Sequence, residues 1–146
     1  MLKSKELLEE TIRKHKTLSL AGFRARDYAE IAGNEFQEDR ANMVNYVEAF
    51  SHCLRFLKRV HKQQDFNFKF NTYVLKHFVE YTTKRKGPRV YVPEGTFIAA
   101  AYASGFKVKR LEHSGFLNAQ IDYGSKGFDI YSGKTKLLAT FDSPPI

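Results

Sequence analysis

The sequence predicts an α+β protein, in which helices come first and strands follow. The distribution of Gly and Pro is the first reason: residues 1–83 contain two glycines and no proline, whereas residues 84–146 contain seven glycines and all four prolines. Because these residues interrupt helices and form turns, the chain changes character near residue 84. The second reason is periodicity, since apolar residues recur every three or four positions in the first part and alternate with polar residues in the second.

One compact domain, 1–146, is expected. The chain has 146 residues, of which 42% are hydrophobic, and this is enough to bury one sizeable core. We divide the domain into a helical part over about 1–83, a basic joint over 84–89 and a strand-rich part over about 90–142.

The helical part is predicted to contain about four helices, over about 4–16, 25–32, 38–62 and 71–84. Gly33 is suited to end the second helix, because glycine adopts the left-handed conformation found at helix ends. The third helix is the longest, and its apolar residues step by three and four from Met43 to Val60, which indicates one buried stripe. The fourth has an aromatic-rich apolar face that includes Tyr73 and Phe78.

Strands are expected mainly after the joint. Residues 65–70 alternate polar and apolar side chains and form either a short strand or a loop into the next helix, and residues 89–92 predict a strand. A short helix follows between Pro93 and Gly105, and its small apolar centre indicates burial against a sheet. Beyond it, four alternating segments separated by Gly and Ser predict an antiparallel meander, with strands over about 106–111, 116–123, 127–132 and 136–141.

Composition disfavours several classes of protein. No apolar run is long enough to span a bilayer, and the first residues lack the apolar segment of a signal peptide, so we expect a cytoplasmic protein. Cys53 is the only cysteine, which excludes an internal disulfide framework and a cysteine-rich zinc site.

No set of residues has the spacing of a catalytic or metal-binding motif, so we expect a non-enzymatic protein without a cofactor. His77 lies on an apolar helical face and is interpreted as a core residue. Asp122 falls on the polar face of a predicted strand, where a solvated side chain explains it. Arg55 and His61 are separated by five residues, a spacing that resembles the Arg-and-His signature of HEPN ribonucleases. That family is all-helical, and the strand-rich half of this chain does not match it.

The net charge of +8 is concentrated in the later part of the chain. Residues 1–50 contain 8 Lys and Arg against 9 Asp and Glu, whereas residues 51–146 contain 16 against 7. Such an excess favours a polyanionic partner, because basic side chains release the counterions that surround nucleic acid. Solubility is the alternative explanation of the same charge.

Residues 23–33 are similar to the first helix and turn of helix-turn-helix modules, where a small residue four positions before the turn glycine permits close helix crossing. Here these residues are Ala29 and Gly33. A recognition helix in the usual register needs an apolar residue near position 39, but this residue is Asp39, and the acidic residues around it would repel phosphate. An ordinary helical hairpin is the alternative interpretation.

The candidate binding residues are eleven cations from the third helix, the basic joint and the strand after the short helix, which we expect to make mainly phosphate contacts. They are Arg55, Lys58, Arg59, Lys62, Lys84, Arg85, Lys86, Arg89, Lys107, Lys109 and Arg110. Alternation makes Lys107 and Lys109 point the same way. Exposed Tyr91, Tyr123 or Tyr131 would add stacking on a single-stranded ligand.

The expected partner is therefore nucleic acid or a nucleoprotein, which this chain would bind as a regulator or accessory factor without membrane contact. The alternative is a phage-type inhibitor, encoded by a mobile element, that binds a host nucleic-acid enzyme or CRISPR effector through protein contacts. A salt titration separates the two, because phosphate binding weakens steeply with salt. The stripe from Met43 to Val60 also fits a short heptad seam, which would allow a homodimer.

Overall fold

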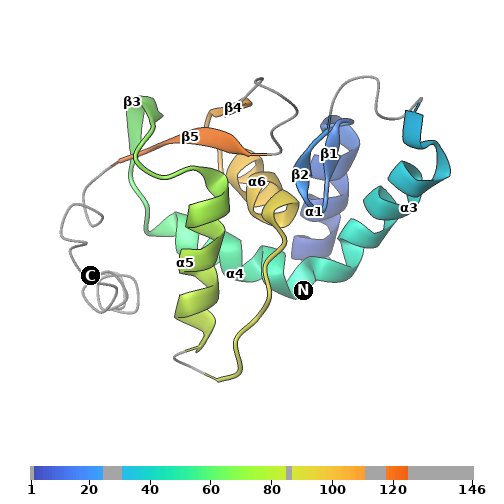
Figure 1. The fold of residues 1–146 in the computed structure, drawn as a ribbon. Coiled ribbons are helices and arrows are strands. Elements are labelled where there is room, and N and C mark those ends of the chain that lie inside the picture. Colours follow the sequence, from blue (N-terminus) through green and yellow to red (C-terminus); the bar gives the residue numbers. More distant parts are fainter. Residues whose placement is uncertain (1, 25–30, 85–86, 111–117, 125–146) are drawn as a thin grey trace.

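The fold is described here from a computed structural model, in residues 2–24, 31–84, 87–110 and 118–124. The chain is an α+β protein, with two small antiparallel sheets beside the helices (Figure 1). α1 (Leu2–Lys14) confirms the first predicted helix. It is followed by a short hairpin of β1 (Leu18–Ser19) and β2 (Gly22–Phe23).

The long helix predicted over 38–62 is divided, and the prediction of one continuous helix is wrong. α3 (Asn34–Asn42) leads into a single 3-10 turn, η1 (Met43–Tyr46), and α4 (Val47–Lys58) then runs in a different direction (Figure 1). The apolar stripe itself is real, because most of its members are buried within this chain. These buried residues are therefore used in the core of this chain.

Two side chains of α3 explain the division. The carboxylate of Asp39 accepts a hydrogen bond from the backbone N–H of Leu20 at 2.8 Å. The guanidinium group of Arg40 donates to three backbone carbonyls at 2.6–2.9 Å, those of Ile12, His15 and Leu18. Arg40 therefore satisfies carbonyls at the end of α1 and holds α3 beside it. α4 instead follows the core, where Phe50 and Cys53 are fully buried, so one straight helix could not make both sets of contacts.

α6 (Glu94–Ala103) confirms the predicted short helix, and it is buried from Glu94 to Ala101. The expectation that it is buried against a sheet is met in part: it lies mainly among α4, α1 and α5, and it also contacts the small β1–β2 sheet at one side (Figure 1). Its small residues permit this arrangement, because the distance between packed helices depends on the side chains at the contact. Gly95 lies so close to β1 that a Cβ atom on it would be 1.7 Å from the carbonyl oxygen of Ser19.

The second sheet has the strand order β3-β5-β4, and each neighbouring pair is antiparallel. β3 spans Lys62–Asn67, β4 spans Val108–Arg110 and β5 spans Ala119–Tyr123. β4 and β5 are neighbours, as the meander requires, but β3 from the helical part occupies the other side of β5. The strands predicted over 127–132 and 136–141 lie outside the described residues, as does most of the helix predicted over 25–32.

β3 is strongly bulged. Between the Lys62–Tyr123 pair and the Asn67–Ile121 pair, it advances five residues while β5 advances two. The extra residues bend the strand and change where its side chains point. The structure thus resolves the ambiguous segment 65–70 into the end of a strand and a loop, which leads into α5 (Thr72–Lys84).

Residues 89–92, predicted as a strand, pair with no strand in the described part of the chain. Side chains of α5 take the place of a neighbouring strand. Thr83 Oγ1 accepts from the backbone N–H of Val90 at 2.9 Å, and Glu80 Oε2 accepts from that of Val92 at 2.8 Å. The segment is therefore extended and attached to a helix.

The hydrophobic core contains residues from both parts of the chain. Leu8, Phe50 and Leu75 from the helical part share one cluster with Phe97 and Ile121 from the later part. Among the described residues, no helix combines the length and apolar character needed to cross a membrane.

Candidate nucleic-acid interface

The outer face of the three-stranded sheet carries two lysines and two phenylalanines. Lys107 precedes β4 and Lys109 lies within it, so both side chains leave the strand on the same face. The Nζ atom of Lys107 lies 6.0 Å from the ring centroid of Phe66 and donates to the backbone oxygen of Gln64 at 2.6 Å. The Nζ atom of Lys109 lies 5.8 Å from the ring centroid of Phe68. We call Phe66, Phe68, Lys107 and Lys109 the Lys–Phe face.

The central strand, β5, contributes buried polar side chains next to this face. β5 separates β4 from β3, so the two lysines reach across β5 to the rings. Asp122 was expected to be solvated, but it is only 3% exposed, and its Oδ1 accepts from the backbone N–H of Lys107 at 2.7 Å. Gln120 is the direct cross-strand neighbour of Lys109 and is also buried. Its Oε1 atom has no hydrogen-bond partner in the described part of the chain.

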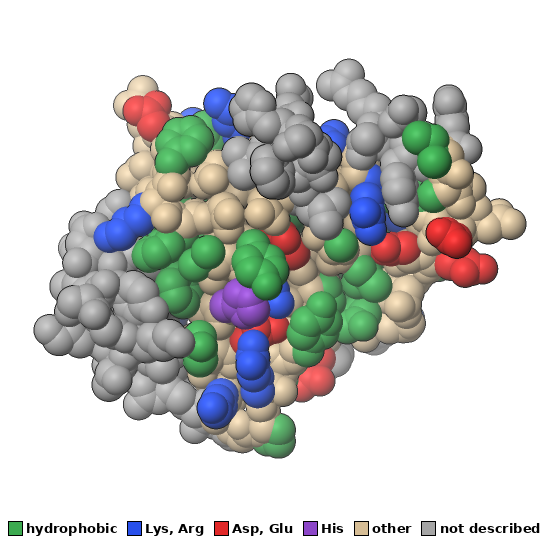
Figure 2. Space-filling model, viewed as in Figure 1, with side chains coloured by type: hydrophobic (Ala, Val, Ile, Leu, Met, Phe, Trp, Pro, Cys, Tyr) green, Lys and Arg blue, Asp and Glu red, His purple; other side chains and the backbone are tan. Residues whose placement is uncertain are grey.

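The Lys–Phe face is open to solvent and basic. Phe68 is 64% exposed, and both lysines are exposed. Within the described residues, neither lysine forms an ion pair with a carboxylate. Figure 2 shows hydrophobic side chains at the surface above β3, with basic and acidic side chains beside them. Asp65 is exposed on β3, but Lys62 on the same strand offsets its charge, so the region remains positive.

The nine predicted cations that fall in the described residues do not lie on one surface. The Nζ atom of Lys62 lies 4.9 Å from the ring centroid of Phe106, the residue before Lys107. Arg55 and Lys58 are in the last turns of α4, and Arg59 follows directly, so this group precedes Lys62 along the chain. Arg55 contacts Nδ1 of His52 at 2.7 Å, whereas His61, its proposed partner in the HEPN-like spacing, lies beyond the end of the helix.

Three other cations are elsewhere. Lys84 ends α5, whose first residue, Thr72, is hydrogen-bonded to β5. At about 1.5 Å per residue, the helix carries Lys84 about 18 Å from that contact. Arg89 is paired with Glu80. Arg110 donates to the backbone oxygen of Arg24 at 2.5 Å and lies over the ring of Phe23. Arg85 and Lys86 lie outside the described residues.

The sequence interpretation missed Phe66 and Phe68 as surface residues. The signal that could have found them is the alternation of residues 65–70, which places both rings two positions apart. The three tyrosines proposed for stacking have different outcomes. Tyr91 is 61% exposed, Tyr123 is fully buried, and Tyr131 lies outside the described residues.

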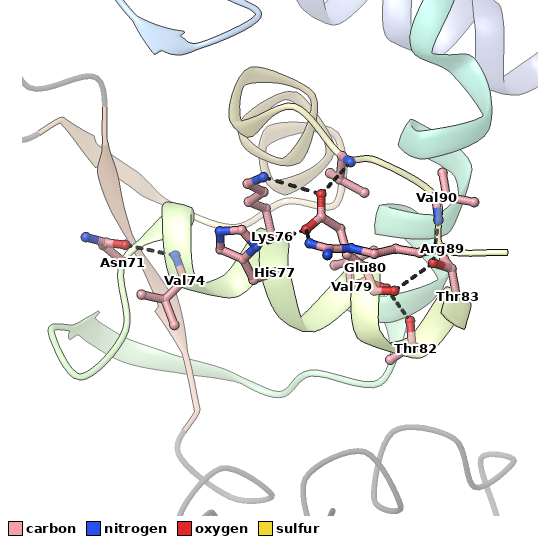
Figure 3. Close-up of polar contacts among 11 residues, drawn as sticks. Asn71, Val74, Lys76, His77, Val79, Glu80, Thr82, Thr83, Arg89 and Val90 are labelled. Atoms are coloured by element: carbon pink, nitrogen blue, oxygen red, sulfur yellow. Dashed lines mark hydrogen bonds and ion pairs between the residues drawn. The ribbon is translucent and has the colours of Figure 1, made fainter. Parts of the chain in front are cut away.

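A second polar group surrounds Glu80 on α5. The carboxylate is fully buried. Its oxygens contact Nζ of Lys76 at 3.3 Å, Nδ1 of His77 at 2.9 Å and a guanidinium nitrogen of Arg89 at 2.5 Å (Figure 3). Burial alone would raise the pKa of Glu80, but hydrogen bonds from the Val92 N–H, Arg89 and His77 and the charge of Lys76 together lower it. Glu80 is thus an ionised anchor for the extended segment. His77 is half-buried and bonded to a carboxylate, rather than enclosed by the apolar core.

Exposed tyrosines lie beside this group. The Nζ atom of Lys76 is 5.5 Å from the ring centroid of Tyr73 and 4.9 Å from that of Tyr91. Tyr91 also packs edge-on against Tyr46, with centroids 6.4 Å apart. We call Tyr46, Tyr73 and Tyr91 the tyrosine face. Figure 2 shows hydrophobic, basic and histidine side chains side by side over this region of α5.

Glu94, the first residue of α6, is a buried acid of a different kind. It is 6% exposed, and its Oε2 accepts from Thr72 Oγ1 at 2.7 Å. The amide nitrogen of Asn118, placed toward Glu94 so that both groups are satisfied, donates to its two oxygens at 2.8 Å. Burial raises the pKa of Glu94 to about 7, although the Thr72 hydrogen bond and the charge of Lys76 oppose the shift. Thr72 Oγ1 also accepts from Ala119 N–H at 3.0 Å, so this carboxyl is linked to β5.

Residues 23–33 resemble the first helix and turn of a helix-turn-helix module. The helix of this segment falls mostly on residues 25–30, which lie outside the described part of the chain. α3 presents Asp39 and Arg40 to the backbone of the N-terminal elements. Glu35, Glu38 and Asp39 also line a shallow acidic hollow of about 560 Å³. This helix therefore holds the N-terminal elements in place and carries an acidic surface, which disfavours phosphate contacts.

Within the described ranges, no group of three or more His, Cys, Asp and Glu side chains is placed to hold a metal ion. Comparison of the chain with protein-family models, curated proteins and solved structures found no match.

Proposed function

We propose that this protein binds nucleic acid without catalysing a reaction, as a cytoplasmic regulator or accessory factor, and that the Lys–Phe face is its contact surface. One observation carries the proposal: Lys107 and Lys109 project across β5 onto the rings of Phe66 and Phe68. Cationic groups next to exposed rings supply both the phosphate contacts and the stacking that nucleic-acid-binding surfaces use.

The state of the other cations supports this choice of surface. Arg89 is paired with Glu80, and Arg110 donates to the backbone oxygen of Arg24 and lies over the ring of Phe23. Lys107 and Lys109 have no carboxylate partner in the described residues, and both residues are exposed. Lys62 and the last turn of α4 extend the positive region beyond the sheet.

The test is equilibrium binding of the purified protein to labelled oligonucleotides, titrated with salt. The double variant Lys107→Glu/Lys109→Glu should bind at least about tenfold more weakly, and the slope of log K against log salt should fall by about 1 to 2. The matched control is Lys3→Glu/Lys5→Glu, which makes the same charge change at exposed positions of α1. Equal loss in both variants, or no binding of the wild type at low salt, would refute the proposal.

The tyrosine face favours a second candidate function, binding to a protein as the inhibitor considered above. Its rings are exposed, yet Lys76 and Tyr46 hold them in place, and rigid tyrosines lose little entropy on binding. Lys76 and Arg89 both pair with Glu80, so their charges are partly compensated within the fold. A complex formed through this face should persist in high salt and be lost in Tyr91→Ala, while Lys107→Glu/Lys109→Glu leaves it intact.

A further inference from the structure

We infer that the Lys–Phe face takes unpaired bases, so that its ligand is a single-stranded nucleic acid rather than a duplex. This inference rests on the proposed function, because it specifies the ligand of the same surface. Three features of the face support it: the exposure of Phe68, the spacing of the two rings, and the side-chain oxygen of Gln120, which no described residue pairs.

The exposure of Phe68 is the first feature. A ring that is 64% exposed contributes little to the core, and Phe has no group that hydrogen-bonds to the edge of a base pair. What it offers is a flat apolar surface. In a duplex the faces of the bases are covered by their neighbours, whereas an unpaired base can lie on such a ring.

The spacing of the rings is the second feature. Phe66 lies in β3 and Phe68 directly follows the end of this strand, so the two rings are two residues apart in the chain. Each ring has its own lysine, Lys107 for Phe66 and Lys109 for Phe68. The face therefore repeats one unit, a ring with a cation beside it, and this unit matches the repeating base and phosphate of a nucleic acid strand. A surface that bound duplex phosphates alone would need the lysines but not the rings.

The third feature is the buried amide of Gln120. Its Oε1 accepts no hydrogen bond from the described residues, and leaving a buried acceptor unpaired is costly. Gln120 lies directly across from Lys109 on β5. A base that displaces the flexible Lys109 side chain would bring an N–H donor of its Watson–Crick edge, such as N3–H of thymine or uracil, to this oxygen, and that edge is free only when the strand is unpaired.

The absence of tryptophan from the chain gives a direct test. Phe68→Trp introduces a single fluorophore at the proposed stacking position, and oligothymidylate or oligouridylate should quench its fluorescence on binding. Tyr73→Trp is the matched control, because Tyr73 is also exposed, at 49%, but belongs to the tyrosine face. The control should not be quenched. Comparison of the two oligonucleotides shows whether DNA or RNA is preferred.

Affinity measurements separate this inference from the proposed function. Phe68→Leu should weaken binding of the single strand on the order of tenfold, and should leave binding of a short mixed-sequence duplex unchanged. If the wild type binds duplex as tightly as single strand and Phe68→Leu changes neither, the inference is overturned while nucleic-acid binding stands. If the wild type binds no oligonucleotide even at low salt, the proposed function and the inference fail together.

Discussion

Glu94 should make the stability of this protein depend on pH near neutrality. In the unfolded chain its carboxyl has an ordinary pKa of 4.5, whereas burial at the start of α6 raises the pKa to about 7. Between these values the folded state holds a proton that the unfolded state releases, so the free energy of unfolding falls as the pH rises. At about 1.4 kcal/mol per pKa unit, the full difference corresponds to about 3 kcal/mol. The stabilisation is complete below about pH 4.5 and lost above about pH 7.

The perturbation is Glu94→Gln, which keeps the shape of the side chain and removes its charge. The amide oxygen of the new residue can still accept from Thr72, and Asn118 can rotate its amide to accept from the new NH₂ group. The free energy of unfolding of the variant should therefore exceed that of the wild type by up to about 3 kcal/mol at pH 8, and by little or nothing at pH 4.5.

The assay is urea unfolding monitored by circular dichroism at a series of pH values. Because other groups also titrate, the quantity of interest is the difference between variant and wild type at each pH. Glu38→Gln, at an exposed position of α3, is the control and should give a difference that varies little with pH. A Glu94→Gln difference that is equally flat would refute the reasoning, because it would mean that the buried carboxyl has the same pKa in both states.

Other substitutions test the packing directly. Gly95→Ala should lower the free energy of unfolding by about 3 kcal/mol or more, because the new Cβ would meet the backbone of Ser19. Gly87→Ala, with open space around it, should change the same free energy by less than about 0.5 kcal/mol. Arg40→Ala should cost about 3 kcal/mol in the same denaturation experiment, since it leaves three carbonyls without their charged donor; a change below 0.5 kcal/mol would contradict that role. Cys53 is fully buried and burial raises the pKa of its thiol, so iodoacetamide should modify it only after unfolding, and rapid modification of the native protein would show that the core opens.

The predicted helices illustrate what a local pattern can and cannot establish. Steps of three and four identified the buried stripe from Met43 to Val60, because one face of a helix must be apolar to pack. The break at η1 was invisible in that pattern. It depends on Arg40 reaching the end of α1, a contact between residues far apart in the sequence.

The candidate site shows the same difference between what a local pattern indicates and what long-range contacts decide. The sequence indicated that Lys107 and Lys109 point the same way, since alternation along a strand requires only local geometry. It did not indicate that Phe66 and Phe68 lie opposite them. That placement follows from β3 pairing with β5, which joins residues more than fifty positions apart. The same pairing buries Asp122, which its strand pattern alone had placed in solvent.

The sequence by itself therefore determined the α+β class, most of the element positions and the basic charge of the later part, because composition and short-range periodicity carry this information. The tertiary structure decided which cations remain available. Arg89 and Arg110 have partners supplied by Glu80 and by the backbone of Arg24, whereas Lys107 and Lys109 are exposed, lack a carboxylate partner in the described residues and lie near the rings of Phe66 and Phe68. Whether a charge is neutralised depends on what the fold brings within a few ångströms of it, and no local pattern contains that distance.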